Sequence, residues 1–326
     1  MTERDYIGNA LQLYGVEEYR LQGGKGDGMR FLRVRNGKGI DLSVSVDRCA
    51  DISDLFFDGV RLNYMSPRGN VAPAYYHLGR DGMGFLDSFN CGLITTCGFD
   101  NIGVPNEDDG ELHGLHGALP NTPASCASYE VTEKAIVIRA IIPDERIFGR
   151  KLVLHRTITV SLEENTLTIE DTVQNCGDHD EPIMYLYHIN YGYPLLSEKM
   201  KLEISSCKVT PRDDHAAEDL DTWNRMLTPT PQFQEQCYYH EFDQDEAVVT
   251  LTNEEIGKKV RMTFPTDVFP YMTQWKMMGI RDYVLGCEPC TNTLEGRHEV
   301  GKAGALQSLK PGEKKQFSVK FRLDRI

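Results

Sequence analysis

The 326-residue sequence lacks any apolar run that approaches the ~20 residues an α-helix needs to cross a bilayer. Its opening segment, MTERDYIGNALQLYG, also lacks the charged start and apolar core of a secretory signal peptide. Both absences argue against a membrane or secreted protein, and we expect a cytoplasmic location.

Positive charge is scarce as well. The 35 Lys and Arg residues face 49 Asp and Glu residues, which gives a formal net charge of −14. Nucleic acids and anionic membranes attract basic surfaces. We therefore expect no nucleic-acid partner and no membrane partner. The composition does not indicate an oligomeric state.

The nine cysteines lack regular spacing. In a reducing compartment such thiols behave as small apolar core residues. Cys287 and Cys290 form one CxxC around Glu288. A zinc site would need a second pair, and a redox motif would need a helix after a strand, whereas the following TNTLEGRHEVG is turn-like. We expect neither a metal nor a redox role here.

No Pro/Ser-rich linker, charge block or short repeat divides the chain, so we expect one domain over residues 1–326. Period-2 alternation, in contrast, is abundant and is typical of half-buried strands. Residues 29–46 predict a hairpin around Asn36–Gly37, and residues 152–173 predict another around a Glu-Glu-Asn turn. Further strands are predicted at 129–141, 182–191, 201–209, 246–252, 258–264, 282–287 and 316–323.

Helical character is confined to two short segments, a lead-in at residues 2–13 and residues 213–220. Many antiparallel strands with short polar turns predict an all-β fold, either a large sandwich or a barrel.

Two residues about a hundred positions apart have the chemistry of a general acid–base pair. His188 lies in YLYHINYGYPLL, where the surrounding aromatic side chains suit the apolar faces of a sugar ring. Glu288 lies in VLGCEPCTN. On the bare sequence, the alternative for His188 is a core histidine that is hydrogen-bonded to backbone.

Two glycine-rich segments hold further polar residues. Asn90–Pro105 contains the pair Asp100–Asn101, and Glu111–Ala124 contains His113 and His116, each followed by glycine. The spacing of the two histidines could bind a metal on a helix, but the glycines indicate a loop. The loop is either a surface turn with solvated imidazoles or a place where the backbone approaches a ligand.

These segments together resemble the aldose 1-epimerases, the family of the galactose mutarotases. VRNGKGIDLSVSVDRCADISDLFFDG resembles the opening strands, and the GLHG around His116 resembles the first histidine motif. The run into His188-Ile189-Asn190-Tyr191 resembles the second. PYMTQWK and the GCEP that contains Glu288 resemble the last two strands of the site. The pieces occur in the family's order and cover most of the chain.

The resemblance implies a galactose mutarotase-like β-supersandwich with a cleft on one sheet, acting on a sugar without a metal or a cofactor. It implies that Glu288 is the base, that His188 is the acid, and that His116 holds the substrate. Arg48, and Gly117-Ala118 in place of a double glycine, depart from the galactose enzymes and indicate a divergent branch whose sugar is open.

Further candidates for substrate binding lie around these motifs. Each also has a simpler interpretation: Arg48 could pair with Asp51, the Asx residues could shape a turn, and Trp275 could be core rather than a stacking platform. Gln274 and Lys276 alternate with Trp275 on a strand, and the segment 232–242 could close the cleft. The substrate-binding set is His116, Asn190, Arg48, Asp100, Asn101, Gln274, Lys276 and Glu235.

Two functions of other classes remain open. One is a non-catalytic carbohydrate-binding protein on the same fold, because a fold does not fix a function. The other is a metal-dependent sugar isomerase, with ligands drawn from His77, His113, His116, and His188 or Glu288.

Overall fold

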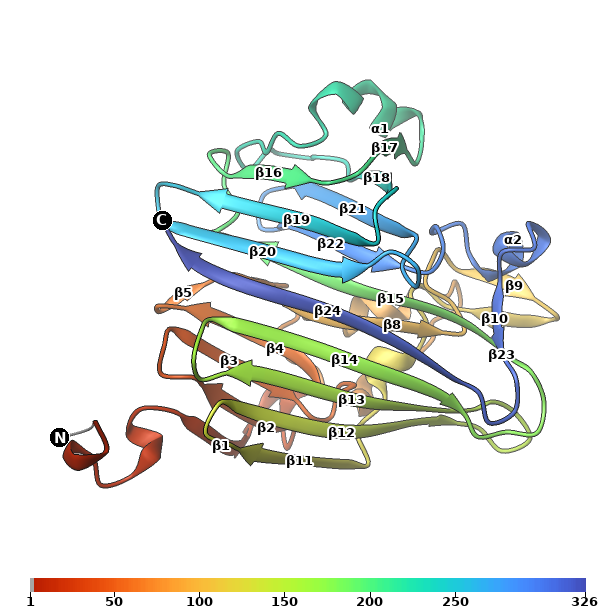
Figure 1. Cartoon of the computed structure of the whole chain (residues 1–326). Helices are drawn as coiled ribbons and strands as arrows, with labels where there is room; N and C mark the ends of the chain where they lie inside the picture. Colours follow the sequence, from red (N-terminus) through yellow and green to blue (C-terminus); the bar gives the residue numbers. More distant parts are fainter. Residues whose placement is uncertain (1–2) are drawn as a thin grey trace.

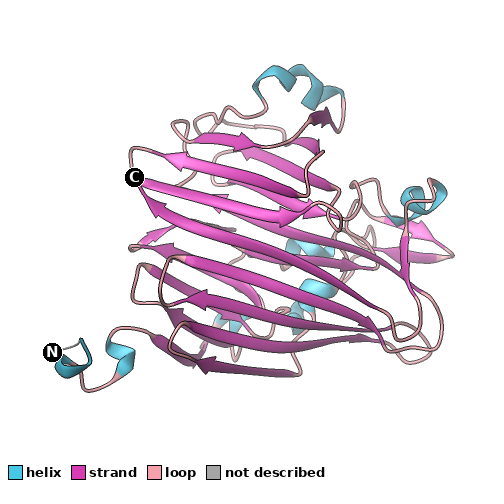
Figure 2. Ribbon diagram, in the orientation of Figure 1, coloured by secondary structure: helices cyan, strands magenta, loops and turns pink. Residues whose placement is uncertain are grey.

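Three antiparallel sheets dominate the computed structural model, which describes residues 3–326 (Figures 1 and 2). The largest has eight strands and lies in front of the other two in Figure 1. Its spatial order is β11 (Cys126–Val131), β12 (Ala135–Glu145), β13 (Lys151–Ser161), β14 (Thr166–Asn175), β24 (Lys314–Arg325), β20 (Lys258–Pro265), β19 (Glu246–Asn253) and β16 (Lys201–Ile204).

The second sheet has seven strands and contains both His188 and Glu288. Its order is β17 (Lys208–Pro211), β18 (Gln236–Glu241), β21 (Tyr271–Met278), β22 (Tyr283–Cys290), β15 (Glu181–Gly192) and β23 (Gln307–Leu309), with β8 (Ile94–Phe99) also paired to β15.

The third sheet has five strands in sequence order, and two further ladders have two strands each. The five are β1 (Gly15–Arg20), β2 (Arg30–Arg35), β3 (Ile40–Ser45), β4 (Asp51–Phe57) and β5 (Val60–Arg61). The short ladders join β6 (Tyr64–Met65) to β7 (Cys91–Gly92) and β9 (Asn106–Asp108) to β10 (Glu111–His113).

Helices are few and short. The α-helices are α1 (Asp214–Glu218) and α2 (Arg297–Lys302). The 3-10 turns are η1 (Glu3–Tyr6), η2 (Ala10–Gln12), η3 (Gly24–Gly26), η4 (Pro73–Tyr75), η5 (Gly84–Asp87), η6 (Leu119–Asn121) and η7 (Leu220–Thr222). Among residues 3–326, no helix has the length and apolar character needed to cross a membrane.

The predicted all-β fold is confirmed, and both predicted hairpins form, as β2–β3 and β13–β14. Two predicted strands are each divided. Residues 129–141 contain a turn between β11 and β12, and residues 201–209 supply β16 and β17, which belong to different sheets. The expected lead-in, described from Glu3 onward, consists of two 3-10 turns in place of one α-helix. The second predicted helix forms as α1, which is capped by Asp213.

The core lies between the large sheet and the two sheets behind it. Every second residue of β13 and β14 is buried, as the alternation predicts. In contrast, β15 is buried on both faces along nearly its whole length. One face packs on the large sheet, and the other faces the loops that surround His188.

A buried charged network joins β15 to the large sheet. Arg156 of β13 forms ion pairs with Asp171 of β14 and with Asp51 of β4. Asp171 also accepts hydrogen bonds of 2.7 Å from the hydroxyls of Tyr185 and Tyr187 of β15. Because every one of these residues is buried, the network fixes the strand that carries His188.

Candidate active site

His188 and Glu288 face one another across two neighbouring strands. The ladder between β15 and β22 pairs Leu186 with Cys290. Counting two residues along each antiparallel strand puts His188 opposite Glu288, and directly opposed residues point to the same face. The sequence separation of a hundred residues is thus reduced to one strand spacing.

The two functional groups are 3.4 Å apart, measured from His188 Nδ1 to Glu288 Oε1. Both side chains are almost completely buried, at 3% and 1% exposure. Neither of these two atoms has a hydrogen-bond partner of good geometry, so both keep their bonding capacity. An unsatisfied buried acid–base pair is costly to a fold and is typical of a functional site.

Burial shifts both groups toward their neutral forms. It raises the pKa of the Glu288 carboxyl well above its ordinary value, and the charge of Glu235 acts in the same direction. It lowers the pKa of the His188 imidazole well below its ordinary value, with His116 contributing in the same sense. Over a wide pH range the pair therefore holds one transferable proton.

A glycine makes room for the carboxyl group. Gly286 precedes Glu288 by two residues on the same face of β22, opposite Trp275. A Cβ atom at Gly286 would lie 2.3 Å from Glu288 Oε1. Any side chain there would displace the carboxyl group from its position beside His188.

His116 enters the same site from the loop after β10. Its ring lies 5.2 Å from the His188 ring, measured between centroids, and its Nδ1 lies 2.7 Å from the carbonyl oxygen of Ile102. Burial lowers the pKa of His116 to about 4, so the ring is neutral near pH 7 and its Nδ1–H donates to this carbonyl. The backbone at His116 is left-handed, with φ of 57°, a strained conformation that clusters at functional sites.

Close packing requires a glycine at Gly117, the residue after His116. Gly117 has φ of 72°, and a Cβ atom there would lie 2.5 Å from the carbonyl oxygen of Gly98. Only glycine allows the His116 loop to lie this close to the end of β8.

The three groups open into one cavity of about 360 Å³. This volume suits a small ligand such as a monosaccharide. Much of the lining is apolar and comes from η5 and from three loops. We call these eight residues the apolar wall: Met83, Phe85, Leu86, Phe89, Val104, Pro105, Leu115 and Leu294. The rings of Phe85 and Phe89 each lie 4.9 Å from a histidine ring of the site.

A polar group of side chains lines the cavity next to β18 and β21. Trp275 Nε1 donates a hydrogen bond of 2.8 Å to Glu235 Oε2. Arg212 lies 3.4 Å from the other carboxylate oxygen of Glu235 and contacts the sulfur of Cys237. Trp275, for which the sequence allowed a core position, is thus half-buried on the cavity face. Glu235 is at the mouth, with its side chain 48% exposed.

Asn190 lies two residues after His188 on the same face of β15, but it is outside the cavity lining. Its amide nitrogen donates hydrogen bonds to the backbone carbonyls of His188 (2.8 Å) and Cys91 (3.3 Å). This geometry fits a residue that positions His188, so the expectation of direct substrate contact needs correction.

Arg48 also lies outside the cavity, which corrects its expected role. The guanidinium is buried and donates to the carbonyl of Val71 and to the side chain of Asn121. It does not pair with Asp51 either, because Asp51 accepts hydrogen bonds from Arg156 and Thr96.

Asp100 and Asn101, which follow β8, shape the loops and line no part of the cavity. The amide nitrogen of Asn101 lies within 3.0 Å of the carbonyls of Gly103, Val104 and Gly114, so it joins two loops. Asp100 lies 3.5 Å from Nδ1 of His113. Because His113 makes this contact and His116 lines the cavity, His116 is the histidine of the candidate site.

Gln274 and Lys276 point away from the cavity, contrary to expectation. They alternate with Trp275 along β21, and alternate residues of a strand face opposite sides. Gln274 contacts His240 and the carbonyl of Trp223, while Lys276 reaches the carbonyl of Thr222. The same parity places His240 and Gln236 behind the sheet.

The CxxC cysteines lie three residues apart on β22, so their side chains face opposite sides of the sheet, and all nine cysteines are free. Within residues 3–326, no three His, Cys, Asp or Glu side chains are grouped as a metal site. His77, a candidate ligand, instead lies 3.5 Å from Asp87.

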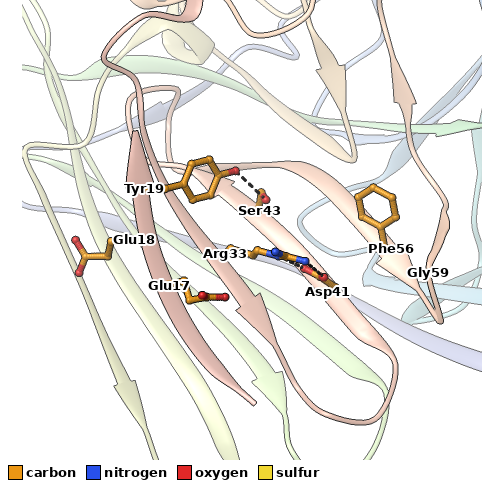
Figure 3. A pocket seen from close by; sticks show the side chains of 8 residues that line it. All are labelled: Glu17, Glu18, Tyr19, Arg33, Asp41, Ser43, Phe56 and Gly59. Carbon is orange, nitrogen blue, oxygen red and sulfur yellow. Dashed lines mark hydrogen bonds and ion pairs between the residues drawn. The ribbon is translucent and has the colours of Figure 1, made fainter. Parts of the chain in front are cut away.

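A larger hollow, of about 720 Å³, lies on the outer face of the five-stranded sheet (Figure 3). Several of its polar groups are paired: Arg33 binds Asp41, the hydroxyl of Tyr19 donates to Ser43, and Glu17 pairs with Arg35 beside the hollow. Because it is shallow and contains no buried acid–base pair, we place the candidate site at His188 and Glu288.

Several cavity residues had no signal in the sequence. Phe85 and Phe89 are four apart, but η5 ends at Asp87, so helical spacing could not relate them. Arg212 follows a short strand and precedes two acidic residues, a pattern that is typical of a surface ion pair.

Comparisons with known proteins agree with the fold. The model of a family described as a domain of unknown function (DUF4432) matches residues 26–323. No curated protein matches the sequence significantly.

Solved structures are similar over almost the whole chain. A "putative aldose 1-epimerase" from Klebsiella pneumoniae subsp. pneumoniae is 27% identical, with a TM-score of 0.90 over 97% of this chain and 86% of that chain. A galactose mutarotase-like protein from Clostridium acetobutylicum is 12% identical (TM-score 0.67; 97% and 100% covered). A galactose 1-epimerase from Lactobacillus acidophilus NCFM is 14% identical (TM-score 0.63; 96% and 99%). The fold is a galactose mutarotase-like β-sandwich.

Proposed function

We propose that this chain, which belongs to the family described as a domain of unknown function (DUF4432), interconverts the α and β anomers of a sugar. The observation that carries the proposal is the buried His188–Glu288 pair at 3.4 Å, open to a cavity of monosaccharide size. The mutarotase-like neighbours support a sugar as the ligand and isomerisation as the reaction.

The reaction begins from the ionised form of the pair, reached when the proton moves from Glu288 to His188. The Glu288 carboxylate removes the proton of the anomeric hydroxyl, while the His188 imidazolium protonates the ring oxygen. The bond between the anomeric carbon and the ring oxygen breaks, and the anomeric carbon becomes a carbonyl. Glu288 is then protonated and His188 is neutral, which is the form that burial favours.

Rotation about the bond to the carbonyl carbon exposes its other face. Reclosure runs with the roles exchanged: neutral His188 takes the proton of the attacking hydroxyl, and protonated Glu288 returns a proton to the carbonyl oxygen. The pair ends with the same single proton, so the cycle consumes nothing. His116 presents a neutral ring nitrogen that can accept a hydrogen bond from a substrate hydroxyl.

The test is anomer exchange, measured by NMR over a panel of sugars and corrected for spontaneous mutarotation. We expect Glu288→Gln to lose ~10²–10⁴-fold in rate, the usual contribution of general acid–base catalysis. The control is Glu181→Gln, which changes another buried carboxyl group, at the start of β15 and outside the cavity. Wild-type exchange by folded Glu288→Gln would contradict the mechanism and favour a carbohydrate-binding protein.

A further inference from the structure

The cavity has a deep reactive end and a mouth of mixed character. His188 and Glu288 are the deeply buried end, at 3% and 1% exposure. Leu86 and Val104 line the same cavity at 51% and 44% exposure, so they form part of its mouth. Glu235 and Arg212 form another part of the mouth, next to β18. A sugar with its anomeric carbon at the pair therefore presents its distal carbons to both parts.

Several backbone groups in the apolar part of the mouth are already hydrogen-bonded within the protein. The N–H of Val104 donates to the carbonyl of Leu294, and the N–H of Leu115 donates to the carbonyl of Gly82. The N–H of Leu86 donates to the carbonyl of Met83. The carbonyl of Val104 already accepts from the side chain of Asn101. These internal bonds occupy three backbone N–H groups and one carbonyl that a substrate hydroxyl placed against the apolar wall would otherwise meet.

We propose that the substrate of this site is a deoxy sugar, with an alkyl carbon where a common hexose has its hydroxymethyl group. The inference rests on the proposed function and names its substrate class. The alkyl group packs on Leu86 and Val104, while ring hydroxyls meet Glu235 and Arg212. Burying a hydroxyl without a partner is unfavourable, whereas a methyl group gains from contact with the apolar wall.

The experiment compares sugars of one enantiomeric series that differ by one oxygen atom: D-fucose with D-galactose, D-rhamnose with D-mannose, and D-quinovose with D-glucose. Exchange between anomers is measured by NMR, and binding is measured by equilibrium titration of the same protein. In at least one pair we expect kcat/KM to favour the 6-deoxy sugar by ~10–100-fold, the range that an apolar pocket can supply against an added hydroxyl.

The outcomes separate the two proposals. Equal or better exchange of the hydroxymethyl sugar in every pair overturns the deoxy-sugar inference and leaves the mutarotase function standing. If no sugar exchanges but the deoxy partner binds at least tenfold more tightly, the inference stands and the mutarotase function falls. If no sugar exchanges and neither partner is preferred in binding, both fall.

Variants at the mouth test which residues cause the preference. Leu86→Asn supplies a donor and an acceptor at an exposed position, so it should fold normally and should reduce the deoxy preference several-fold. The matched control is Ile147→Asn, at an 86% exposed position in the turn between β12 and β13. A preference that survives both Leu86→Asn and Val104→Asn would show that the apolar wall does not select the substrate.

Discussion

His116 Nδ1 lies 2.7 Å from the carbonyl oxygen of Ile102, and this contact fixes which ring nitrogen carries the proton. With Nδ1 as the donor, Nε2 is the proton-free nitrogen, and the pKa of about 4 keeps it so near neutral pH. His116 is thus an acceptor of hydrogen bonds at the site and a poor proton donor.

We expect His116→Phe to lower kcat/KM by about tenfold, the equivalent of one net hydrogen bond. The ring remains and the acceptor is lost, so the effect should fall mainly on KM. His77→Phe, at an exposed histidine, is the control and should be silent. If His116→Phe lowers kcat/KM as much as Glu288→Gln does, His116 itself takes part in proton transfer.

The pH dependence of activity should reflect the two opposite pKa shifts. The pair works while it holds one proton, that is, between the lowered pKa of His188 and the raised pKa of Glu288. On lowering the pH, activity should persist through about 6.5, where an ordinary histidine titrates, and should fall only well below it. A kcat/KM profile with its acid midpoint near 6.5 would contradict the burial argument.

The two tryptophans lie on opposite faces of the second sheet. The fluorescence of Trp275 can therefore report ligand binding, and Trp223 can serve as the control. Trp275 lines the cavity, whereas Trp223 packs on His240 behind the sheet. We expect a bound sugar to change the tryptophan fluorescence of the wild-type protein and of the Trp223→Phe variant. The fluorescence of the Trp275→Phe variant should not change when the sugar is added. A signal that disappears with Trp223 instead would place the ligand on the wrong side of β21.

The buried network around Arg156 predicts a large stability effect. Arg156→Met leaves Asp51 and Asp171 buried without their cation, and removal of one partner from such a network costs about 3–5 kcal/mol. Urea unfolding measures the change in the free energy of unfolding. Arg322→Met, at an exposed pair, should cost less than about 1 kcal/mol. Similar losses in the free energy of unfolding for the two variants would show that the buried network stabilises the fold no more than an exposed ion pair does.

Side-chain alternation along the sequence was a better guide to the strands that carry the candidate acid–base pair than to the residues that line the cavity. It predicted the strand of His188, and it predicted a strand at 282–287 that extends in the structure to Cys290 and so includes Glu288. The same parity makes it impossible for Trp275 and Lys276 to share a face. Applied strictly, it would have removed Gln274 and Lys276 as soon as Trp275 was placed in the cavity.

Loop residues could not be sorted in this way. Asn101 and Arg48 were plausible ligand-binding groups, and only their buried partners reveal them as structural. The apolar wall comes from η5 and from three loops, and its members meet through long-range packing that no local pattern specifies. Sequence therefore predicts the candidate acid–base pair better than the surface that would select a substrate.

The position of β24 has a consequence for biosynthesis. This strand is close to the end of the chain, yet it pairs with β14 on one side and β20 on the other, in the interior of the large sheet (Figure 1). While a ribosome is still translating upstream residues, the two halves of that sheet have nothing to join them, and each exposes an unpaired edge. Until residues 314–325 emerge, the nascent protein is therefore most exposed to aggregation and most dependent on chaperones.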